Sequence, residues 1–251
     1  MKKNYALLFA FVMGVFSLSN AQVVINEFSA ANKSVYADAS GEYNDWLEIY
    51  NPTGAAVNIG GWYLSDSPGN LTKWQIPAGV TVNANGFKIF FCSNRGGVFS
   101  GQQHTNFKLT QSDTSEILLL TNTSGVIVDS TTVYPTRVNH SRGRATNGAG
   151  NWSVFQTPTP NASNNTQTAY PAYVPKVQFS LPAGFYSGTQ SVSLTCSMAN
   201  TSIRYTTNGA VPTTASTLFA GPISVSANTV IRARAFDNSS VYAGSFDETN
   251  S

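Results

Sequence analysis

Charged residues are scarce in this chain of 251 residues, and their scarcity excludes one class of partner. Only 10% of the residues are charged, and the formal net charge is +2. Lys2 and Lys3 account for that excess: the 14 basic residues less these two leave 12, against 12 acidic residues. Binding to nucleic-acid phosphates requires a concentrated basic face, so we expect no nucleic-acid partner.

Cysteine and histidine are too few for a disulfide framework, a zinc cluster or a catalytic triad. Cys92 and Cys196 fall in segments that we assign to different domains, and each follows the apolar pattern of a strand. We expect both to be buried free thiols rather than an interdomain bridge. His104 and His140 fall in expected loops, where a loop hydrogen bond or solvation is the expectation for each. The sequence therefore predicts no catalytic residues and no enzyme.

Long hydrophobic runs are also absent after the first residues. Lys2 and Lys3 precede an apolar run over residues 5–16, and small residues follow up to Ala21. This pattern predicts a signal peptide over residues 1–21 and export, with a mature chain that begins at Gln22. A membrane anchor is the alternative, but the run is too short to span a bilayer, and we expect no transmembrane span after the signal peptide is removed.

No segment has a sustained helical apolar stripe, whereas short β-prone runs recur between Gly, Asn, Ser and Thr. The clearest run is Asp45–Asn51, which ends at Pro52. Leu47 and Ile49 share one parity of this strand and are expected on the core side, opposite Trp46, Glu48 and Tyr50. The sequence thus predicts an all-β fold.

A proline-rich stretch divides the mature chain. Residues 159–175 have no apolar period and contain prolines that deny ladder hydrogen bonds, so we interpret them as a linker. One domain is predicted before it, over residues 22–158, and a second after it, over residues 176–251. In the first domain we expect strands near residues 23–28, 46–50, 61–65, 73–76, 87–92, 117–120, 126–130 and 141–144.

The first domain resembles the lamin tail domain as it occurs in exported bacterial proteins. The resemblance rests on Ile25–Phe28, Asp45–Asn51, Asn58–Asp66 and Trp74–Pro77, with Trp152 near its end. It implies an immunoglobulin-like β-sandwich that serves as an interaction or architectural module and has no catalytic residues.

The second domain resembles the chitobiase/β-hexosaminidase C-terminal-type domain, another small immunoglobulin-like sandwich. The resemblance rests on Ile203–Thr213 and Val230–Phe236, where Ile231, Ala233 and Ala235 share one parity. Relatives usually continue through one more strand, so the resemblance implies a truncated second domain and a missing C-terminal domain. Similar front ends precede a spore-coat-type kinase in exported bacterial proteins.

One acidic group suggests a metal site. Asp38, Glu42 and Asp45 carry oxygen ligands of the kind that calcium prefers, although the spacing is not that of an EF-hand. The alternative is that Asp38 and Glu42 are solvated, while Asp45, Glu27 and Glu48 accept hydrogen bonds or pair with Lys or Arg. A glycosidase pair is disfavoured because Asp45 and Glu48 fall on opposite faces of one strand. Calcium is the only cofactor considered.

The aromatic residues Tyr170, Tyr173, Phe185 and Tyr186 allow two interpretations. They could bind a polysaccharide, or they could form a hydrophobic seam between the domains, which we favour. The sequence as a whole predicts a secreted or cell-surface, non-catalytic module for adhesion, presentation or spacing, with a cell-surface protein or polysaccharide as partner. The alternatives are the front of a larger exported kinase or hydrolase, and a carbohydrate-binding accessory module.

Overall fold

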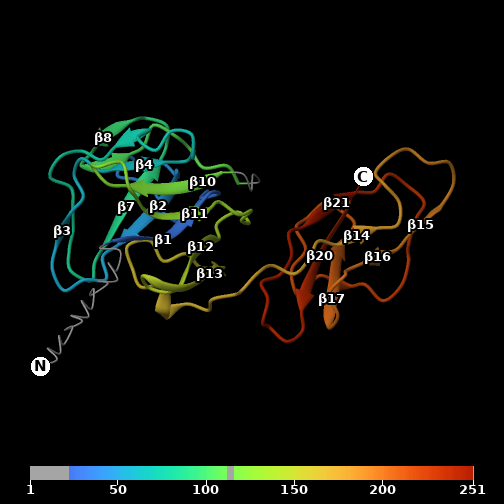
Figure 1. Cartoon of the computed structure of the whole chain (residues 1–251). Helices are drawn as coiled ribbons and strands as arrows, with labels where there is room; N and C mark the ends of the chain where they lie inside the picture. Colours follow the sequence, from blue (N-terminus) through green and yellow to red (C-terminus); the bar gives the residue numbers. More distant parts are fainter. Residues whose placement is uncertain (1–22, 112–115, 251) are drawn as a thin grey trace, which may run out of the picture.

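The computed structural model describes residues 23–111 and 116–250, and nearly all of their regular structure is β-strand (Figure 1). The predicted signal peptide lies outside the described residues. One short 3-10 turn, η1, covers Asn164–Thr166. The strands of the first domain are β1 (Val24–Ser29), β2 (Asp45–Tyr50), β3 (Val57–Asn58), β4 (Tyr63–Ser65), β5 (Trp74–Gln75), β6 (Thr81–Val82), β7 (Phe87–Cys92), β8 (Gly97–Phe99), β9 (Gln102–His104), β10 (Ile117–Thr121), β11 (Ile127–Thr132), β12 (Ser141–Thr146) and β13 (Ala149–Phe155).

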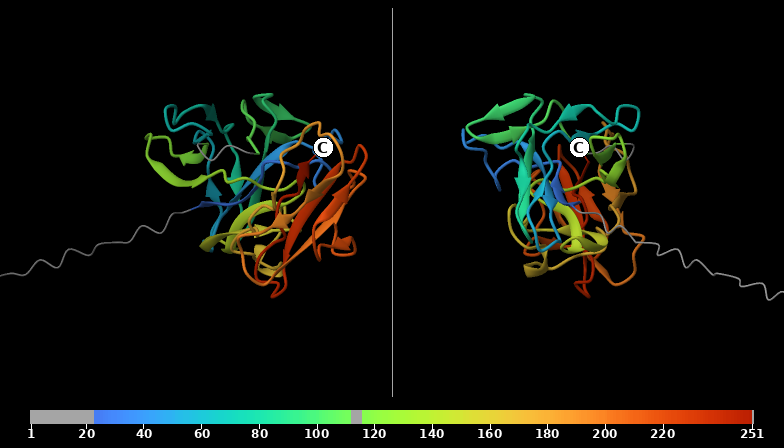
Figure 2. Two further views of the ribbon diagram at one scale, coloured as in Figure 1. Left: turned by 90° about the vertical axis from the view of Figure 1, so that its right-hand side faces the viewer. Right: turned by 60° about the vertical axis from the view of Figure 1, so that its left-hand side comes forward.

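Two sheets enclose the core of the first domain, which Figure 2 shows from two further sides. One sheet has seven strands in the order β13-β12-β1-β2-β7-β9-β8, and the other has four in the order β11-β10-β4-β5. Leu47 and Ile49 from the larger sheet pack with Leu64 and Leu118 from the smaller one. The domain is an immunoglobulin-like β-sandwich, and the predicted core side of β2 is confirmed.

A β-bulge in β1 decides which face of the large sheet carries its acidic residues. Ile25 pairs with Ile49 and Glu27 pairs with Glu48, so Asn26 is an extra residue between the two pairs. In a regular strand Ile25 and Glu27 would point to the same face. The bulge reverses the parity, so that Ile25 faces the core and Glu27 joins Glu48 on the outer face.

The outer face of the large sheet is covered rather than open to solvent. Trp46 is fully buried there, with the ring of Tyr36 packed edge-on at 6.3 Å between centroids. Tyr36 also stacks on Phe91 at 5.7 Å. A loop that precedes β2 thus supplies a second, smaller layer over this face. Three of the four tryptophans, Trp62, Trp74 and Trp152, pack in or against the main core.

Every strand predicted in the first domain is present, and the structure adds β3, β6, β8, β9 and β13. The prediction for His104 was wrong: it lies at the end of β9, almost completely buried, and is not a solvated loop residue. Its ring stacks on Phe91 at 5.1 Å, and its Nδ1 lies 2.9 Å from Ser93 Oγ. His104 is buried because β9 pairs in parallel with β7, which places its ring beside Phe91.

Asn51 ends β2 through its side chain as well as its backbone. The buried amide donates to the carbonyl oxygens of Ala55, Val82 and Asn83 at 2.7 to 3.0 Å. Its Oδ1 accepts from the Thr53 backbone N–H at 2.9 Å. One side chain therefore satisfies the backbone of two neighbouring loops where the chain leaves the sheet.

Replacing this amide should be among the more destabilising polar substitutions in the domain. Asn51→Ala leaves buried carbonyls without a donor, and we expect it to lower the free energy of unfolding by about 2–3 kcal/mol. Asn58→Ala, which removes a single contact to the Gly60 backbone N–H from an exposed side chain, should cost about 0.5 kcal/mol. Urea unfolding measures both. Equal losses in the two variants would contradict the structural role of Asn51.

The second domain is a smaller sandwich with its own core. Its strands are β14 (Gln178–Phe179), β15 (Gln190–Val192), β16 (Leu194–Thr195), β17 (Thr201–Thr206), β18 (Thr217–Leu218), β19 (Ile223–Val225), β20 (Ile231–Asp237) and β21 (Glu248–Asn250). A four-stranded sheet, β18-β17-β20-β21, faces the two-stranded pairs β14-β16 and β15-β19. Ile231, Ala233 and Ala235 are buried in the core with Val192 and Leu194, which confirms the predicted parity of β20.

Both cysteines are free thiols, as predicted. Cys92 is buried in the core of the first domain. Cys196 is only half-buried and packs against the second core, where its thiol lies 3.5 Å from the Pro175 carbonyl oxygen. Its partial exposure differs from the expectation because it follows β16, at the margin of that core.

Residues 159–167, the first half of the predicted linker, do not form a free connection. Thr159 and Asn164 are buried against the large sheet, and Asn147 accepts from the Asn164 backbone N–H at 2.9 Å. The sequence showed no apolar pattern here because polar side chains make these contacts. The segment behaves as an additional part of the first domain.

Candidate functional site

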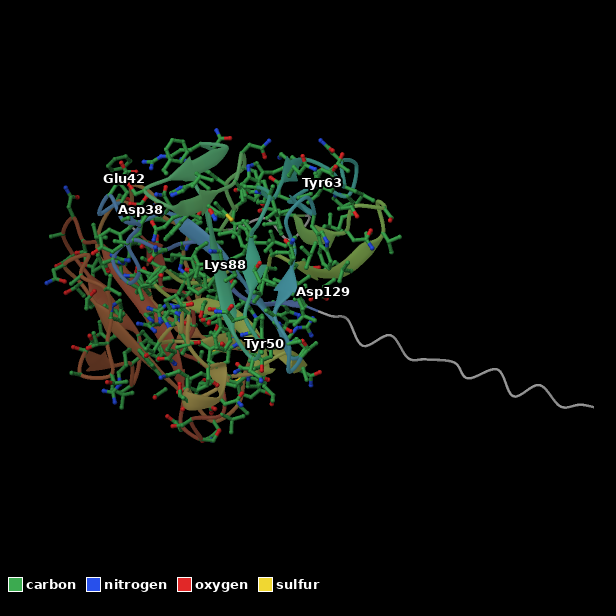
Figure 3. The ribbon with its side chains drawn as sticks, turned by 90° about the vertical axis from the view of Figure 1, so that its left-hand side faces the viewer. Asp38, Glu42, Tyr50, Tyr63, Lys88 and Asp129 are labelled. Carbon is green, nitrogen blue, oxygen red and sulfur yellow. The ribbon has the colours of Figure 1, made fainter. Side chains whose placement is uncertain are left out.

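The predicted metal loop is closed by its own hydrogen bonds. Asp38 Oδ1 accepts from the backbone N–H groups of Ser40 and Glu42 at 2.8 and 3.0 Å, and its Oδ2 accepts from the Asn44 amide at 3.1 Å. Figure 3 shows Asp38 and Glu42 near each other at one end of the domain. Asp38 is buried rather than solvated, which corrects one expectation for this loop.

A basic side chain approaches both carboxylates of this loop. The Arg95 guanidinium lies 3.6 Å from Asp38 Oδ2 and also pairs with Glu42. Burial by itself would raise the pKa of Asp38, but the two backbone N–H groups and the charges of His104 and Arg95 outweigh it and lower that pKa. The loop is thus held by an ion pair that the sequence could not reveal, because Arg95 lies far along the chain.

Asp45, the third predicted ligand, does not join this pair. Its Oδ1 accepts from the Asn32 backbone N–H at 3.4 Å, and burial raises its pKa to about 6. Over residues 23–111 and 116–250, no three acidic, histidine or cysteine side chains are grouped so that they could hold a metal ion. Calcium binding stays a prediction, and thermal unfolding with calcium and with a chelator is its test.

Substitutions should separate the structural role of Asp38 from that of Glu42. Asp38→Ala leaves two backbone N–H groups without their acceptor and should lower the free energy of unfolding by about 1–3 kcal/mol. Glu42→Ala removes a mostly exposed ion pair and should cost less than about 1 kcal/mol. Chemical denaturation distinguishes the two. A larger loss for Glu42→Ala would mean that the Arg95 pair, not the loop bonds, holds this segment.

The most unusual polar feature is a pair of buried carboxylates, Glu27 and Glu48. They are direct cross-strand neighbours, and both are completely inaccessible to solvent. Glu27 accepts from the Thr159 backbone N–H at 3.0 Å, from the Thr159 hydroxyl at 2.6 Å and from the Ser141 hydroxyl. Glu48 accepts from the Asn161 backbone N–H at 2.6 Å and from the Asn26 amide at 3.1 Å.

These two carboxylates hold residues 159–164 against the sheet, and we call this arrangement the carboxylate clasp. Asn164 completes it: its amide donates to the Arg144 carbonyl oxygen at 2.9 Å, and its Oδ1 lies 2.9 Å from the Thr159 hydroxyl oxygen. The hydrogen bonds that the structure gives Glu27 and Glu48 come from amide and hydroxyl donors, not from Lys or Arg. The alternative in which they accept hydrogen bonds is therefore confirmed.

Burial without a cation disfavours two negative charges in the clasp. Burial, reinforced by the charge of Glu27, raises the pKa of Glu48 to about 9. Burial also raises the pKa of Glu27, although hydrogen bonds from Ser141 and Thr159 oppose it. Glu48 accepts fewer hydrogen bonds than Glu27, and with a pKa of about 9 it carries a proton at neutral pH.

The clasp should make stability depend on pH. Because the pKa of Glu48 is higher in the folded chain than in the unfolded chain, its contribution is complete below about pH 4.5 and is lost as pH rises toward 9. We expect the free energy of unfolding to fall by at least ~2 kcal/mol between pH 5 and 9. Glu48→Gln should remove most of this slope, as urea unfolding at several pH values would show.

Glu42→Gln serves as the control, because this carboxylate is mostly exposed and its substitution should leave the slope unchanged. A slope in Glu48→Gln that equals the wild-type slope would contradict the assignment of the proton to Glu48.

Tyr173 lies at the centre of the seam between the two domains. Its ring stacks on His140 of the first domain and packs at 4.9 Å on Phe246 of the second. Its hydroxyl accepts from the Arg137 backbone N–H at 3.1 Å and lies 3.1 Å from His140 Nδ1. His140 is therefore a packed and hydrogen-bonded loop residue, consistent with the loop hydrogen bond expected for it.

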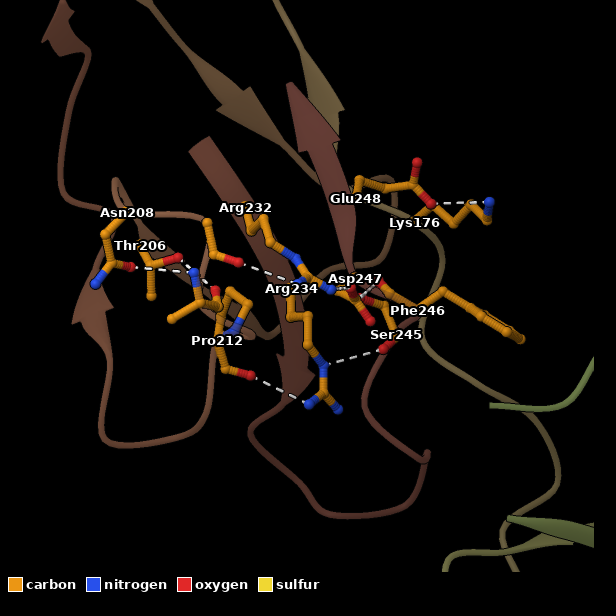
Figure 4. Close-up of polar contacts among 12 residues, drawn as sticks. Lys176, Thr206, Asn208, Pro212, Arg232, Arg234, Ser245, Phe246, Asp247 and Glu248 are labelled. Carbon is orange, nitrogen blue, oxygen red and sulfur yellow. Dashed lines mark hydrogen bonds and ion pairs between the residues drawn. The ribbon is translucent and has the colours of Figure 1, made fainter. Parts of the chain in front are cut away.

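Basic side chains surround this tyrosine. Arg142 lies over the Tyr173 ring at 5.5 Å, and burial together with the charges of Arg137 and Arg234 lowers the pKa of His140 to about 4. Figure 4 shows how Arg234 is fixed: it donates to the carbonyl oxygens of Ser245 and Pro212 at 3.2 and 3.1 Å. Backbone carbonyls and aromatic faces thus hold cations at the seam.

The four aromatic residues considered for sugar binding divide between two places. Tyr173 fills the seam, as the seam interpretation predicted, whereas Tyr170 makes a backbone bridge with Val154 of β13. Phe185 and Tyr186 instead lie exposed on a loop before β15, where they line a cleft in the second domain. The sequence could not predict which of the four lie at the seam and which at the cleft, because all four fall near loops.

Comparison with protein families assigns both domains. The model of the lamin tail domain matches residues 17–135, and the model of the chitobiase/β-hexosaminidase C-terminal domain matches residues 181–244. The chain carries these two domains in this order. The lamin tail match covers β1 to β11, including Glu27 and Glu48, whereas β12, β13 and the segment 159–164 that these carboxylates hold follow it. The kinase context that the resemblance implied stays a prediction.

No curated protein matches the chain. Within residues 23–111 and 116–250, the structure has no helix whose length and apolarity would let it cross a membrane.

Proposed function

We propose that this chain is an exported, non-catalytic module that holds two immunoglobulin-like domains in a fixed arrangement for presentation or spacing at the cell surface. The chitobiase-type domain suggests an extracellular, carbohydrate-active context, which supports export. The observation that carries the proposal is the backbone pairing of residues 170–174 with both domains.

This pairing joins the domains through main-chain hydrogen bonds. On the first domain, the N–H groups of Val154 and Tyr170 donate to each other's carbonyl oxygens at 2.7 and 3.0 Å. On the second, Ala243 N–H donates to the Ala172 oxygen at 3.0 Å, and Val174 N–H donates to the Ala243 oxygen at 2.8 Å. Domains on a flexible linker move independently by default. A linker that is itself a strand partner of both domains removes that freedom.

The chemistry of the described residues supports a non-catalytic role. Both histidines are already engaged in hydrogen bonds within the fold, His104 with Ser93 and His140 with Tyr173. The buried carboxylates of the clasp accept hydrogen bonds from a packed segment of the chain. The cleft of the second domain has no acid, histidine or cysteine among the described residues that line it. General acid-base or nucleophilic catalysis requires such groups to converge in an accessible pocket.

Calorimetry of the full chain tests the fixed arrangement. We expect wild type to unfold in one coupled transition, because loss of either domain exposes the Tyr173 seam. Tyr173→Ala should remove about 3 kcal/mol of packing and separate the two domain transitions. Tyr173→Phe keeps the ring and should give an intermediate result.

Tyr186→Ala is the matched control, since this tyrosine is exposed and distant from the seam in the sequence. Two independent transitions in wild type, or a coupled transition that survives Tyr173→Ala, would contradict the proposal.

A further inference from the structure

The second domain contains a cleft of about 750 Å³ that the proposed spacing role does not use. One wall is the loop over residues 180–189, which extends from the strands on the side away from the first domain (Figure 1). The opposite wall is the segment over residues 225–231, between β19 and β20. A concave site of this volume is within the range that small ligands occupy.

The floor of the cleft is apolar and belongs to the fold. Val192 and Ile231 are buried residues of the second core, and Val225 packs against them. These side chains fix the bottom of the cleft, because they are held by the same contacts that hold the sandwich together.

The rim is polar but uncharged. None of the described residues that line the cleft is Asp, Glu, Lys, Arg or His. Its polar members carry hydroxyl or amide groups: Tyr186, Thr189, Gln190, Ser226, Asn228, Thr229 and Asn250. A charged ligand would lose its hydration here without meeting an opposite charge, which is unfavourable. The lining therefore selects for a neutral ligand.

Several of these polar groups have free hydrogen-bonding capacity. The side chains of Thr189, Ser226 and Asn228 make no hydrogen bond to other described residues. Gln190 uses its amide N–H to donate to Ser187 and Gly188, and Asn250 donates to Leu181, so both amide oxygens remain available as acceptors. The rim thus presents donors and acceptors that only a ligand or water can satisfy.

Two exposed aromatic rings, Phe185 and Tyr186, also line the cleft. Phe185 is fully exposed, and Tyr186 is 45% exposed. The Tyr186 hydroxyl donates to the Pro182 carbonyl oxygen at 2.8 Å, which closes the loop on itself and fixes the ring. A fully exposed phenylalanine beside an apolar floor offers a flat hydrophobic face without any partner in the described chain.

From these observations we propose that the cleft binds an uncharged polysaccharide chain. Sugar rings present apolar C–H faces that stack on aromatic rings, and equatorial hydroxyls that exchange hydrogen bonds with amides and hydroxyls. Both features are matched here, by the rings of Phe185 and Tyr186 and by the amides of Gln190, Asn228 and Asn250. The proposal goes beyond presentation and spacing, which need no ligand, and either can fail while the other holds.

Titration of the full chain with soluble oligosaccharides tests the cleft. The probes are cellohexaose and the hexamer of N-acetylglucosamine, with an oligogalacturonate as the anionic comparator, followed by calorimetry and by NMR shifts. We expect binding of at least one uncharged probe, no binding of the anionic one, and shifts confined to residues 181–192 and 225–231 and to Asn250.

Three variants assign the contacts. Phe185→Ala and Tyr186→Ala should each weaken binding about tenfold, which corresponds to ~1.4 kcal/mol. Asn228→Ala should weaken it less, by about threefold. Tyr43→Ala, which removes an exposed tyrosine of the first domain, is the matched control and should leave binding unchanged. The seam variant Tyr173→Ala should also bind normally, which separates this result from the test of the fixed arrangement.

Four outcomes would overturn the proposal: no binding of either uncharged probe at millimolar concentration, preference for the anionic probe, affinity that is insensitive to Phe185→Ala and Tyr186→Ala, or self-association that Phe185→Ala abolishes. The last would show that a second copy of the chain, rather than a polysaccharide, covers the loop.

Discussion

The burial of two carboxylates without a cation is the constraint on which much of this structure depends. The bulge at Asn26 places Glu27 beside Glu48 on one face of the large sheet, where neither can reach solvent. Buried charge is tolerated only when it is hydrogen-bonded or neutralised. Residues 159–164 supply three of the donors, beside Ser141 and Asn26, so docking of this segment stabilises the sheet. The clasp therefore fixes the start of the connection between the domains.

From the clasp the connection continues directly into the seam. Residues 164–166 form η1 on the first domain, Tyr170 pairs with β13, and Tyr173 packs against both domains. Each contact shortens the stretch of chain that could act as a hinge. Figure 1 shows that the cleft loop lies on the far side of the second domain from this joint. The structure thus combines a fixed joint at one end of that domain with an accessible surface at the other.

Local pattern was enough to predict most of the fold. Period-two alternation identified the core residues Leu47 and Ile49 in β2 and Ile231, Ala233 and Ala235 in β20, because each side chain's face follows from its own strand. The bulge at Asn26 was not predictable from the sequence, since nothing local requires an extra residue there. The segment that covers Glu48 was not predicted either. Its donor, Asn161, lies 113 residues away in the sequence and contributes a backbone N–H, which no side-chain pattern can reveal.

The candidate sites were harder to predict for the same reason. Asp38 and Glu42 were predicted as calcium ligands from their carboxylates alone, and the sequence does not show that Arg95 approaches both. Tyr173 and Tyr186 had equivalent sequence surroundings, yet one is at the seam and the other at a cleft. Sequence reasoning gave the aromatic residues as a group, but only tertiary contacts assign each of them to the seam or to the cleft.

The central claim is that the two domains form one unit, and NMR relaxation of the full chain tests it most directly. Backbone amides in β1, β2 and β7 report on the tumbling of the first domain, and those in β17 and β20 report on the second. A fixed joint predicts the same rotational correlation time for both sets, equal to that of a particle of 26.8 kDa. Two different, shorter correlation times would show independent domains and contradict the account.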